Sequence, residues 1–278
     1  MNKKTNAIMI NRELANNKFN TYIKKNQLTL HFPKSQEFKN QEIALAYLGL
    51  YYSWRNVTIT NNNNKFGYRW VDNVFYPIDL PDGFYSIFDL NNFMQQITMT
   101  NNNHFVLDAS NEKVFFIDIK VNPTYYSATT TCRPIAVPNG GSNPHSIPLG
   151  DVPQLEILDN NFGSLIGYDV GLYPPTAGTT VDYYVNSQNI ANITPVTSVN
   201  VNVNLAESQN SIFSNSIYQF SPTVPYASYI SFQTTYPMFY DISNGSYKDI
   251  TVYFTDQSGK PLDILDGNIN ITLLVRDR

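Results

Sequence analysis

The chain has 278 residues, of which 42% are hydrophobic and 14% aromatic, and it carries a formal net charge of −4. That much apolar material can fill a buried core, which excludes a wholly disordered chain. The length allows one large domain, or one domain that carries a sizeable insertion. Charged residues make up only 14%, well below the roughly 25% of ordinary soluble domains, so the surface is predicted to be polar but weakly charged.

Asparagine is abundant and clustered, as in residues 61–64 and 101–103. A surface rich in Asn and Tyr suits contact with neighbouring proteins, because burying these side chains costs less desolvation than burying Lys or Glu. A genome rich in A·T pairs would also raise the Asn, Ile, Tyr and Lys content. The two explanations are compatible.

The start of the chain is basic, since residues 1–40 hold eight Lys or Arg and only two Glu. Residues 1–26 are predicted to form a basic N-terminal arm that can touch nucleic acid or an acidic surface, and a solvated, fraying terminus is equally compatible. Met1 to Lys4 leads into polar sequence, so no signal peptide is predicted. No apolar run of about eighteen residues is present to span a membrane.

The first predicted strands are at residues 28–32 and 43–48. Both faces of the second run are apolar, which is typical of a strand in the middle of a sheet or in a subunit contact. Residues 57–60 and 66–70 flank an Asn-rich turn and predict a hairpin. After the Pro81-Asp82-Gly83 turn, Ser86 and Asp89 have capping-box spacing before a helix whose apolar residues are Ile87, Leu90, Phe93, Met94 and Ile97.

Two strands follow at residues 105–107 and 114–121, and the Pro-, Gly-, Ser- and Thr-rich stretch 122–151 then predicts a long excursion with no packed element. A short strand at 155–158 precedes a helical turn that Asp159 or Asn160 caps and Gly167 ends.

Strict alternation of Val and Asn over residues 199–205 predicts a half-exposed strand. Further strands are predicted at residues 217–220, 229–233, 250–254 and 269–275. About ten strands with one or two short helices predict an all-β fold, an antiparallel single jelly-roll β-sandwich with a loop-rich insertion. We expect the arm at 1–26, the first part of the jelly roll at 27–121, the insertion at 122–198 and the second part at 199–278.

Residues for catalysis or metal binding are not evident. The histidines His31, His104 and His145 are far apart in sequence, and no HExxH or CxxC pattern occurs. Cys132 precedes Arg133, which could lower the pKa of its thiol, but a lone cysteine in a predicted loop is more often inert. We therefore predict no enzyme activity, no catalytic, metal-binding or cofactor-binding residue, and no cofactor.

Three carboxylates, Asp256, Asp263 and Asp266, lie among Gly and Pro near the end of the chain. They could form a glycosidase pair or a calcium site, but tight turns between strands explain them better.

Four segments, in order, resemble the penton or minor capsid proteins, with a single jelly roll, of virophages, polinton-like viruses and related protist DNA viruses. The matching stretches are residues 48–60, 80–86, 162–168 with 173–175, and 252–257 with 261–262 and 265–266. Residues 125–150 and 176–198 match less well, which leaves the outward-facing insertion uncertain.

The resemblance implies a structural protein of the virion, assembled in the host cell, that forms a homopentamer at the five-fold vertices of an icosahedral capsid and contacts the major capsid protein. It implies that the basic arm faces inward, towards the genome, an internal membrane or neighbouring capsid proteins. The expected inward-facing residues are Lys3, Lys4, Arg12, Lys18, Lys24 and Lys25. No small-molecule substrate is expected. The alternatives are a spike, turret or cement protein for host attachment, and a jelly-roll carbohydrate-binding module or hydrolase.

Overall fold

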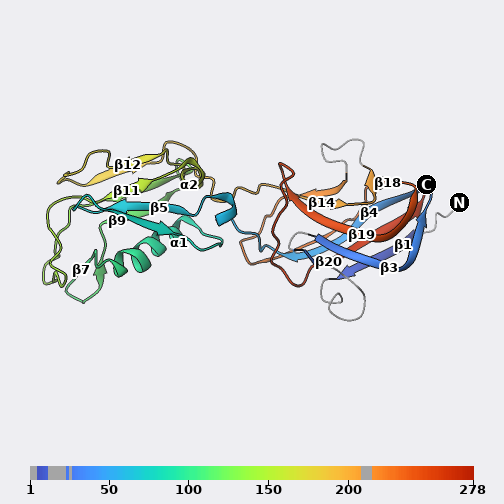
Figure 1. Ribbon diagram of the computed structural model, residues 1–278, viewed down its shortest axis with the longest axis horizontal. Coiled ribbons are helices and arrows are strands. Elements are labelled where there is room, and N and C mark those ends of the chain that lie inside the picture. Colours follow the sequence, from blue (N-terminus) through green and yellow to red (C-terminus); the bar gives the residue numbers. More distant parts are fainter. Residues whose placement is uncertain (1–4, 12–22, 25–26, 208–214) are drawn as a thin grey trace. The chain divides into compact units, whose positions relative to one another are not determined.

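The computed structural model describes residues 5–11, 23–24, 27–207 and 215–278. The chain divides into two compact units. The first joins Met1–Trp54 to Val196–Arg278, and the second, Arg55–Pro195, is inserted between them. The predicted all-β class is confirmed, because the described residues form antiparallel sheets with two short helical regions (Figure 1).

The first unit contains two sheets. The six-stranded sheet, called sheet A, has the order β1 (Thr5–Asn11), β20 (Asn270–Asp277), β4 (Gln41–Tyr51), β18 (Tyr240–Ile242) and β15 (Ala206–Glu207), with β17 (Tyr229–Gln233) also paired to β4. The five-stranded sheet, called sheet B, has the order β16 (Ser216–Phe220), β14 (Val199–Val203), β19 (Gly245–Asp256), β3 (Gln27–Phe38) and β2 (Ile23–Lys24).

The two sheets stack as the antiparallel sandwich of a jelly roll. Buried and more exposed residues alternate along most of β19 and β20, and the inward residues Leu48, Leu50 and Val252 are fully buried. Aromatic rings connect the layers: Phe232 of sheet A lies 4.8 Å from Phe220 of sheet B, centroid to centroid. The ends of the chain, brought together in this way, build one shared core.

The structure corrects the predicted arm over residues 1–26. Thr5–Asn11 is not an arm but an edge strand, β1, which pairs along its whole length with β20. Its side chains explain the pairing, because Ile10 is buried while Met9 faces outward. Removing Thr5–Asn11 would therefore uncover the edge of β20.

The prediction of a half-exposed strand at residues 199–205 is wrong. All five residues of β14 are buried, including Asn200 and Asn202. Their amides remain satisfied, since Asn200 Nδ2 donates to the Asp256 carbonyl at 2.7 Å and Asn202 Nδ2 donates to Thr255 Oγ1 at 3.2 Å. Buried Asn is tolerated where its amide is hydrogen-bonded, so alternation of Val and Asn does not identify the solvent face here.

The inserted unit has three sheets and two helical regions. A four-stranded sheet has the order β12 (Gly171–Tyr173), β11 (Gln154–Ile157), β5 (Lys65–Arg69) and β6 (Phe75–Asp79). The smaller sheets are β13 (Tyr183–Asn186), β10 (Ser127–Cys132) and β9 (Ile117–Asn122), and the pair β7 (Val106–Leu107) and β8 (Lys113–Val114). The helical segments are η2 (Ile59–Asn61), α1 (Ile87–Asn92), the π-helical η3 (Phe93–Met99) and α2 (Asn160–Ile166).

Two sequence predictions in this unit change. The hairpin partner of β5 is β6, not residues 57–60, which form a single bridge and the short η2. The stretch 122–151 does contain a packed element, since β10 lies between β9 and β13. The division of the chain also differs from the predicted one: the insertion begins at Arg55, not at 122, because strands β5 to β13 pair only among themselves.

The predicted helix forms, with its capping box intact. Ser86 Oγ accepts from the Asp89 amide and the Asp89 carboxylate accepts from the Ser86 amide. Ile97 was expected to face the core seven residues after Leu90, as α-helical geometry requires. The helix instead continues with π-helical turns, which rotate Ile97 outward and bury Met99.

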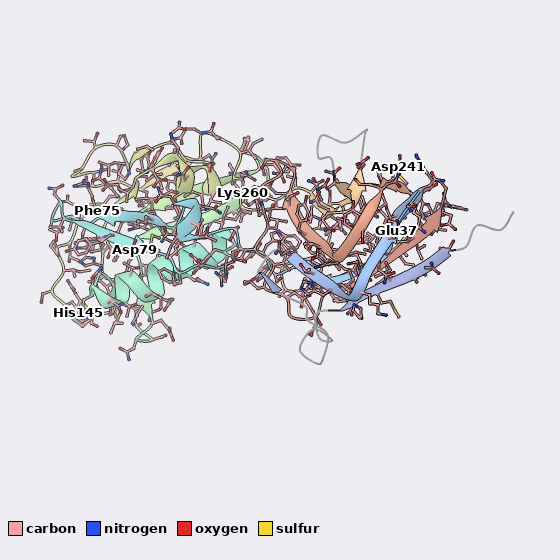
Figure 2. The ribbon with its side chains drawn as sticks, turned by 45° about the vertical axis from the view of Figure 1, so that its right-hand side comes forward. Glu37, Phe75, Asp79, His145, Asp241 and Lys260 are labelled. Atoms are coloured by element: carbon pink, nitrogen blue, oxygen red, sulfur yellow. The ribbon has the colours of Figure 1, made fainter. Side chains whose placement is uncertain are left out.

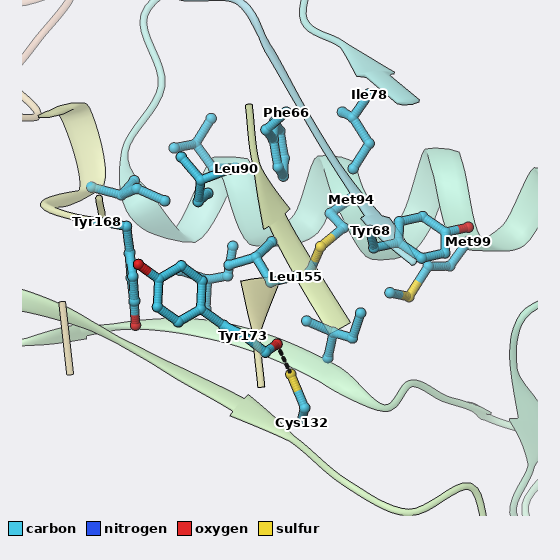
Figure 3. Packing of buried hydrophobic residues seen from close by; sticks show 14 of the residues in the cluster. Phe66, Tyr68, Ile78, Leu90, Met94, Met99, Cys132, Leu155, Tyr168 and Tyr173 are labelled. Carbon is cyan, nitrogen blue, oxygen red and sulfur yellow. Dashed lines mark hydrogen bonds between the residues drawn. The ribbon is translucent and has the colours of Figure 1, made fainter. Parts of the chain in front are cut away.

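The core of the inserted unit lies between its sheets and α1 (Figure 3). Phe66 of β5 stacks on Phe162 of α2 with ring centroids 4.4 Å apart, and Gly167 ends α2 in the left-handed conformation, as predicted. Cys132 is in this core and not in a loop. Its Sγ lies 3.3 Å from the Tyr173 carbonyl, and burial raises the pKa of the thiol to about 12, so the thiol is unreactive at neutral pH.

Side chains of α1 and η3 cover one edge of the sheet β13-β10-β9. β9 is the outer strand of its sheet, and its free backbone groups face α1 and η3. Asn91 Oδ1 accepts from the Ile119 amide at 2.8 Å, and Gln95 Nε2 donates to the Ile117 carbonyl at 2.8 Å. An edge whose hydrogen bonds are filled in this way cannot pair with another strand.

We expect Gln95→Ala to lower the free energy of unfolding of the inserted unit by about 1–3 kcal/mol, because the Ile117 carbonyl would remain buried without a partner. Urea unfolding followed by tryptophan fluorescence measures the change. Gln96→Ala is the matched control, since Gln96 is the exposed neighbour on the same helix. Equal stabilities of the two variants would contradict the role of Gln95.

Candidate interaction surfaces and a polar cleft

The outward face of sheet A has an uncharged central band. Its members, which we call the uncharged face, are Ala7 and Met9 of β1, Ala44, Tyr47 and Tyr51 of β4, Thr272 and Leu274 of β20, and Tyr229 of β17. Cross-strand register places them together, with Met9 opposite Thr272 and Tyr51 opposite Tyr229. Met9 is 75% exposed. The ion pair of Glu42 with Arg276 lies at the other end of β4.

The tyrosines on this face hold one another in place. Tyr47 Oη lies 3.2 Å from Tyr229 Oη, and the rings of Tyr51 and Tyr229 meet edge to face at 5.1 Å. Gly49 leaves the space that they occupy, because a Cβ there would lie 2.1 Å from Tyr229 Oη. The cluster is thus built by sequence positions that are far apart.

The outward face of sheet B is lined by hydroxyl and amide groups. Thr29 Oγ1 and Thr251 Oγ1 are 2.9 Å apart, and Asn200 and Asn202 reach Thr255. Of these groups, Thr29, Asn200, Asn202 and Thr255 are buried, and His31 and Asp249 continue the same face with their side chains 3.9 Å apart.

A polar cleft of about 390 Å³ opens within the inserted unit. Three segments line it: Trp70 and Asp72 at the β5–β6 turn, Asn102 to His104 after η3, and residues 145–148. The structure therefore brings together two of the three histidines, His104 and His145, although they are 41 positions apart. Figure 2 shows His145 at the outer edge of this unit.

His104 is fixed from several directions. Its ring stacks on Trp70 at 4.1 Å with the planes nearly parallel, and Tyr76 meets it edge-on at 4.6 Å. Asn102 Nδ2 donates to Tyr68 Oη at 2.9 Å, and Tyr68 Oη lies 3.0 Å from His104 Nδ1. Because Tyr68 Oη already accepts from Asn102, we assign the Tyr68 hydroxyl as the donor to Nδ1, which leaves the proton of the neutral ring on Nε2.

The cleft has one carboxylate. Asp72 accepts from the Val74 amide at 2.8 Å and from Tyr76 Oη at 3.0 Å. Burial lowers the pKa of His104 to about 4, and Asp72 opposes this shift only weakly. A histidine with that pKa is a poor general base at neutral pH, and its Nδ1 is bonded to a tyrosine and not to a carboxylate.

The other sequence candidates are placed as follows. Asp256 accepts from the Ser258 and Lys260 amides, and Asp266 accepts from the Tyr51 and Asn268 amides, so both stabilise turns. Within the described ranges, no three His, Cys, Asp or Glu side chains converge as a metal site. No helix in the part of the chain that the structure describes is long and apolar enough to cross a membrane.

The structure describes few of the residues that were predicted to face inward. Lys3, Lys4, Arg12, Lys18 and Lys25 lie outside the described residues, and only the backbone of Lys24 is placed, in β2 opposite Gln27. Sequence analysis missed the uncharged face and the cleft. The apolar second face of residues 43–48 was the signal for the first, whereas no local signal joins Asp72, His104 and His145.

Comparison with solved structures finds 18 similar chains, among them those of a mavirus penton protein and of the Sputnik virophage. The mavirus penton protein aligns with a TM-score of 0.45 and 9% identity, covering 99% of this chain and 98% of that one. The Sputnik virophage structure aligns with a TM-score of 0.38 and 13% identity, covering 100% and 98%. No protein-family model and no curated protein sequence matches the chain. At such identities few side chains are shared, so no residue role carries over.

We expect the stability of the inserted unit to fall between pH 6.5 and about 4 in a way that depends on His104. In that window the unfolded chain takes up a proton at this residue while the folded chain does not, which removes at most about 3 kcal/mol. Urea unfolding across this range should show a shallower decline for His104→Phe than for the parent chain. Parallel declines would contradict the assignment.

Proposed function

We propose that this chain is a non-enzymatic structural subunit of a viral capsid, which assembles with copies of itself as a homopentamer at the five-fold vertices. The uncharged face of sheet A carries the proposal. A sandwich already has its core between the sheets, so an outward face with Met9, Leu274 and three tyrosines calls for a second occupant.

The character of this face fits a subunit contact. Interface cores are depleted in charge and enriched in Tyr and Met, as this band is. Ala44 and Gly49 are themselves buried, and the tyrosines that fill the space beside Gly49 form the surface that a partner would meet. Among the charged residues of sheet A, Glu42 and Arg276 neutralise each other at 2.9 Å.

A ring requires a head-to-tail contact. If the uncharged face meets a different surface of the next copy, the contact is head-to-tail, and it forms a ring when the rotation between copies closes. The sequence resemblance to penton proteins supports five copies. We place the protein in the virion, in contact with the major capsid protein, with the basic N-terminal residues towards the genome or an internal membrane.

Native mass spectrometry of the purified full chain tests the assembly. We expect a species of five chains. A trimer would favour the spike or turret alternative over a penton, and a monomer at all concentrations would contradict self-assembly.

Charge added to the uncharged face should break the ring. We expect the double variant Met9→Lys and Tyr229→Lys to shift the mass to the single chain, because two lysines would have to be desolvated in the contact. Val170→Lys with Val181→Lys is the matched control, since both valines are exposed residues of the inserted unit. Pentamers of the first variant as stable as those of the control would contradict the assigned contact.

A further inference from the structure

We infer that the polar cleft of the inserted unit binds a neutral sugar, such as the terminal hexose or N-acetylhexosamine of a glycan. At about 390 Å³ the cleft falls within the size range of small-ligand sites. It lies wholly inside the unit Arg55–Pro195, so the inference is independent of how the sandwich assembles.

The first argument is the state of His104. This residue is only 6% exposed, yet its Nε2 has no hydrogen-bond partner among the described residues, and the side chain lines the cleft. A polar nitrogen needs a partner in the protein or in water, so the partner of Nε2 comes from whatever occupies the cleft. Here Trp70, Tyr76 and Tyr68 hold the ring rigidly with one donor left for a ligand.

The second argument is the chemistry of the lining. Asp72 supplies a carboxylate that two hydrogen bonds orient, and each oxygen retains a further acceptor site. Asn103 and Ser146 are exposed groups that both donate and accept. A sugar hydroxyl also donates and accepts, so a vicinal pair of hydroxyls matches a carboxylate beside an amide.

The third argument concerns charge and shape. No Lys or Arg lines the cleft, and its one carboxylate repels anionic ligands, so sialylated or sulfated glycans are disfavoured. The exposed Pro148 supplies an apolar surface for the C–H groups of a sugar ring, while Ile147 beside it belongs to the core. The exposed ring of His145, braced edge-on by Phe105 at 4.9 Å, adds a flat surface beside them.

Saturation-transfer NMR on the full chain tests the inference with methyl glycosides of glucose, galactose, mannose and N-acetylglucosamine, and with sialyllactose as the anionic probe. We expect at least one neutral glycoside to bind. We expect Asp72→Asn, which keeps the shape of the side chain, to weaken that binding at least tenfold, because a charge-assisted hydrogen bond is lost.

Asp79→Asn is the matched control, because Asp79 lies on β6 of the same unit, pairs with Lys65 at 3.3 Å and does not line the cleft. It should bind as the parent chain does. Circular dichroism melting of both variants establishes that they are folded. The inference is overturned if no neutral glycoside binds at millimolar concentration, if sialyllactose binds better, or if Asp72→Asn binds as well as Asp79→Asn.

Discussion

Buried backbone N–H and C=O groups outside the sheets and helices need hydrogen-bond partners, and in this protein the side-chain amides of Asn supply them at several loops. The side chain of Asn56 alone binds three backbone groups: its Nδ2 donates to the carbonyls of Tyr85 and Ile193, and its Oδ1 accepts from the Tyr85 amide. Asn63 joins the Asn56 carbonyl to the Thr58 amide. A buried backbone group without a partner would cost about 1–3 kcal/mol, so each amide removes a penalty that would otherwise exclude the loop from the core.

The same residue type also shapes the turns. Among the described residues, five of the eight non-glycine positions with positive φ are asparagines: Asn40, Asn62, Asn73, Asn103 and Asn111. Asparagine adopts this left-handed conformation more readily than other L-residues because its short side chain bonds locally. The Asn-rich composition thus has a structural use beyond the two explanations that the sequence suggested.

The use of amide side chains in place of charged ones also determines which surfaces can be buried in a contact. An Asn or Tyr can be buried in the fold or in a contact with modest desolvation, whereas Lys or Glu cannot. The sandwich can therefore present the uncharged face of sheet A to a partner, while the inserted unit keeps a cleft whose polar groups are already oriented. The proposed division has the sandwich assembling and the inserted unit recognising a ligand.

What the sequence determined by itself is local. The Ser86–Asp89 capping box, the Gly167 end of α2 and the strands β17, β19 and β20 each depend on neighbours within a few positions, so they could be predicted. The all-β class followed from the number of strands that the local patterns predicted.

Contacts between distant positions were decided only by the tertiary structure. The pairing of β5 with β6, the burial of Asn200, the edge pairing of β1 and the convergence of Asp72 with His104 and His145 leave no local pattern. The start of the insertion at Arg55 was missed for the same reason, because both units consist of similar strands and only their separate cores divide them. Local spacing encodes which segments become strands, whereas the choice of partner depends on shape and hydrogen-bond satisfaction across the whole chain.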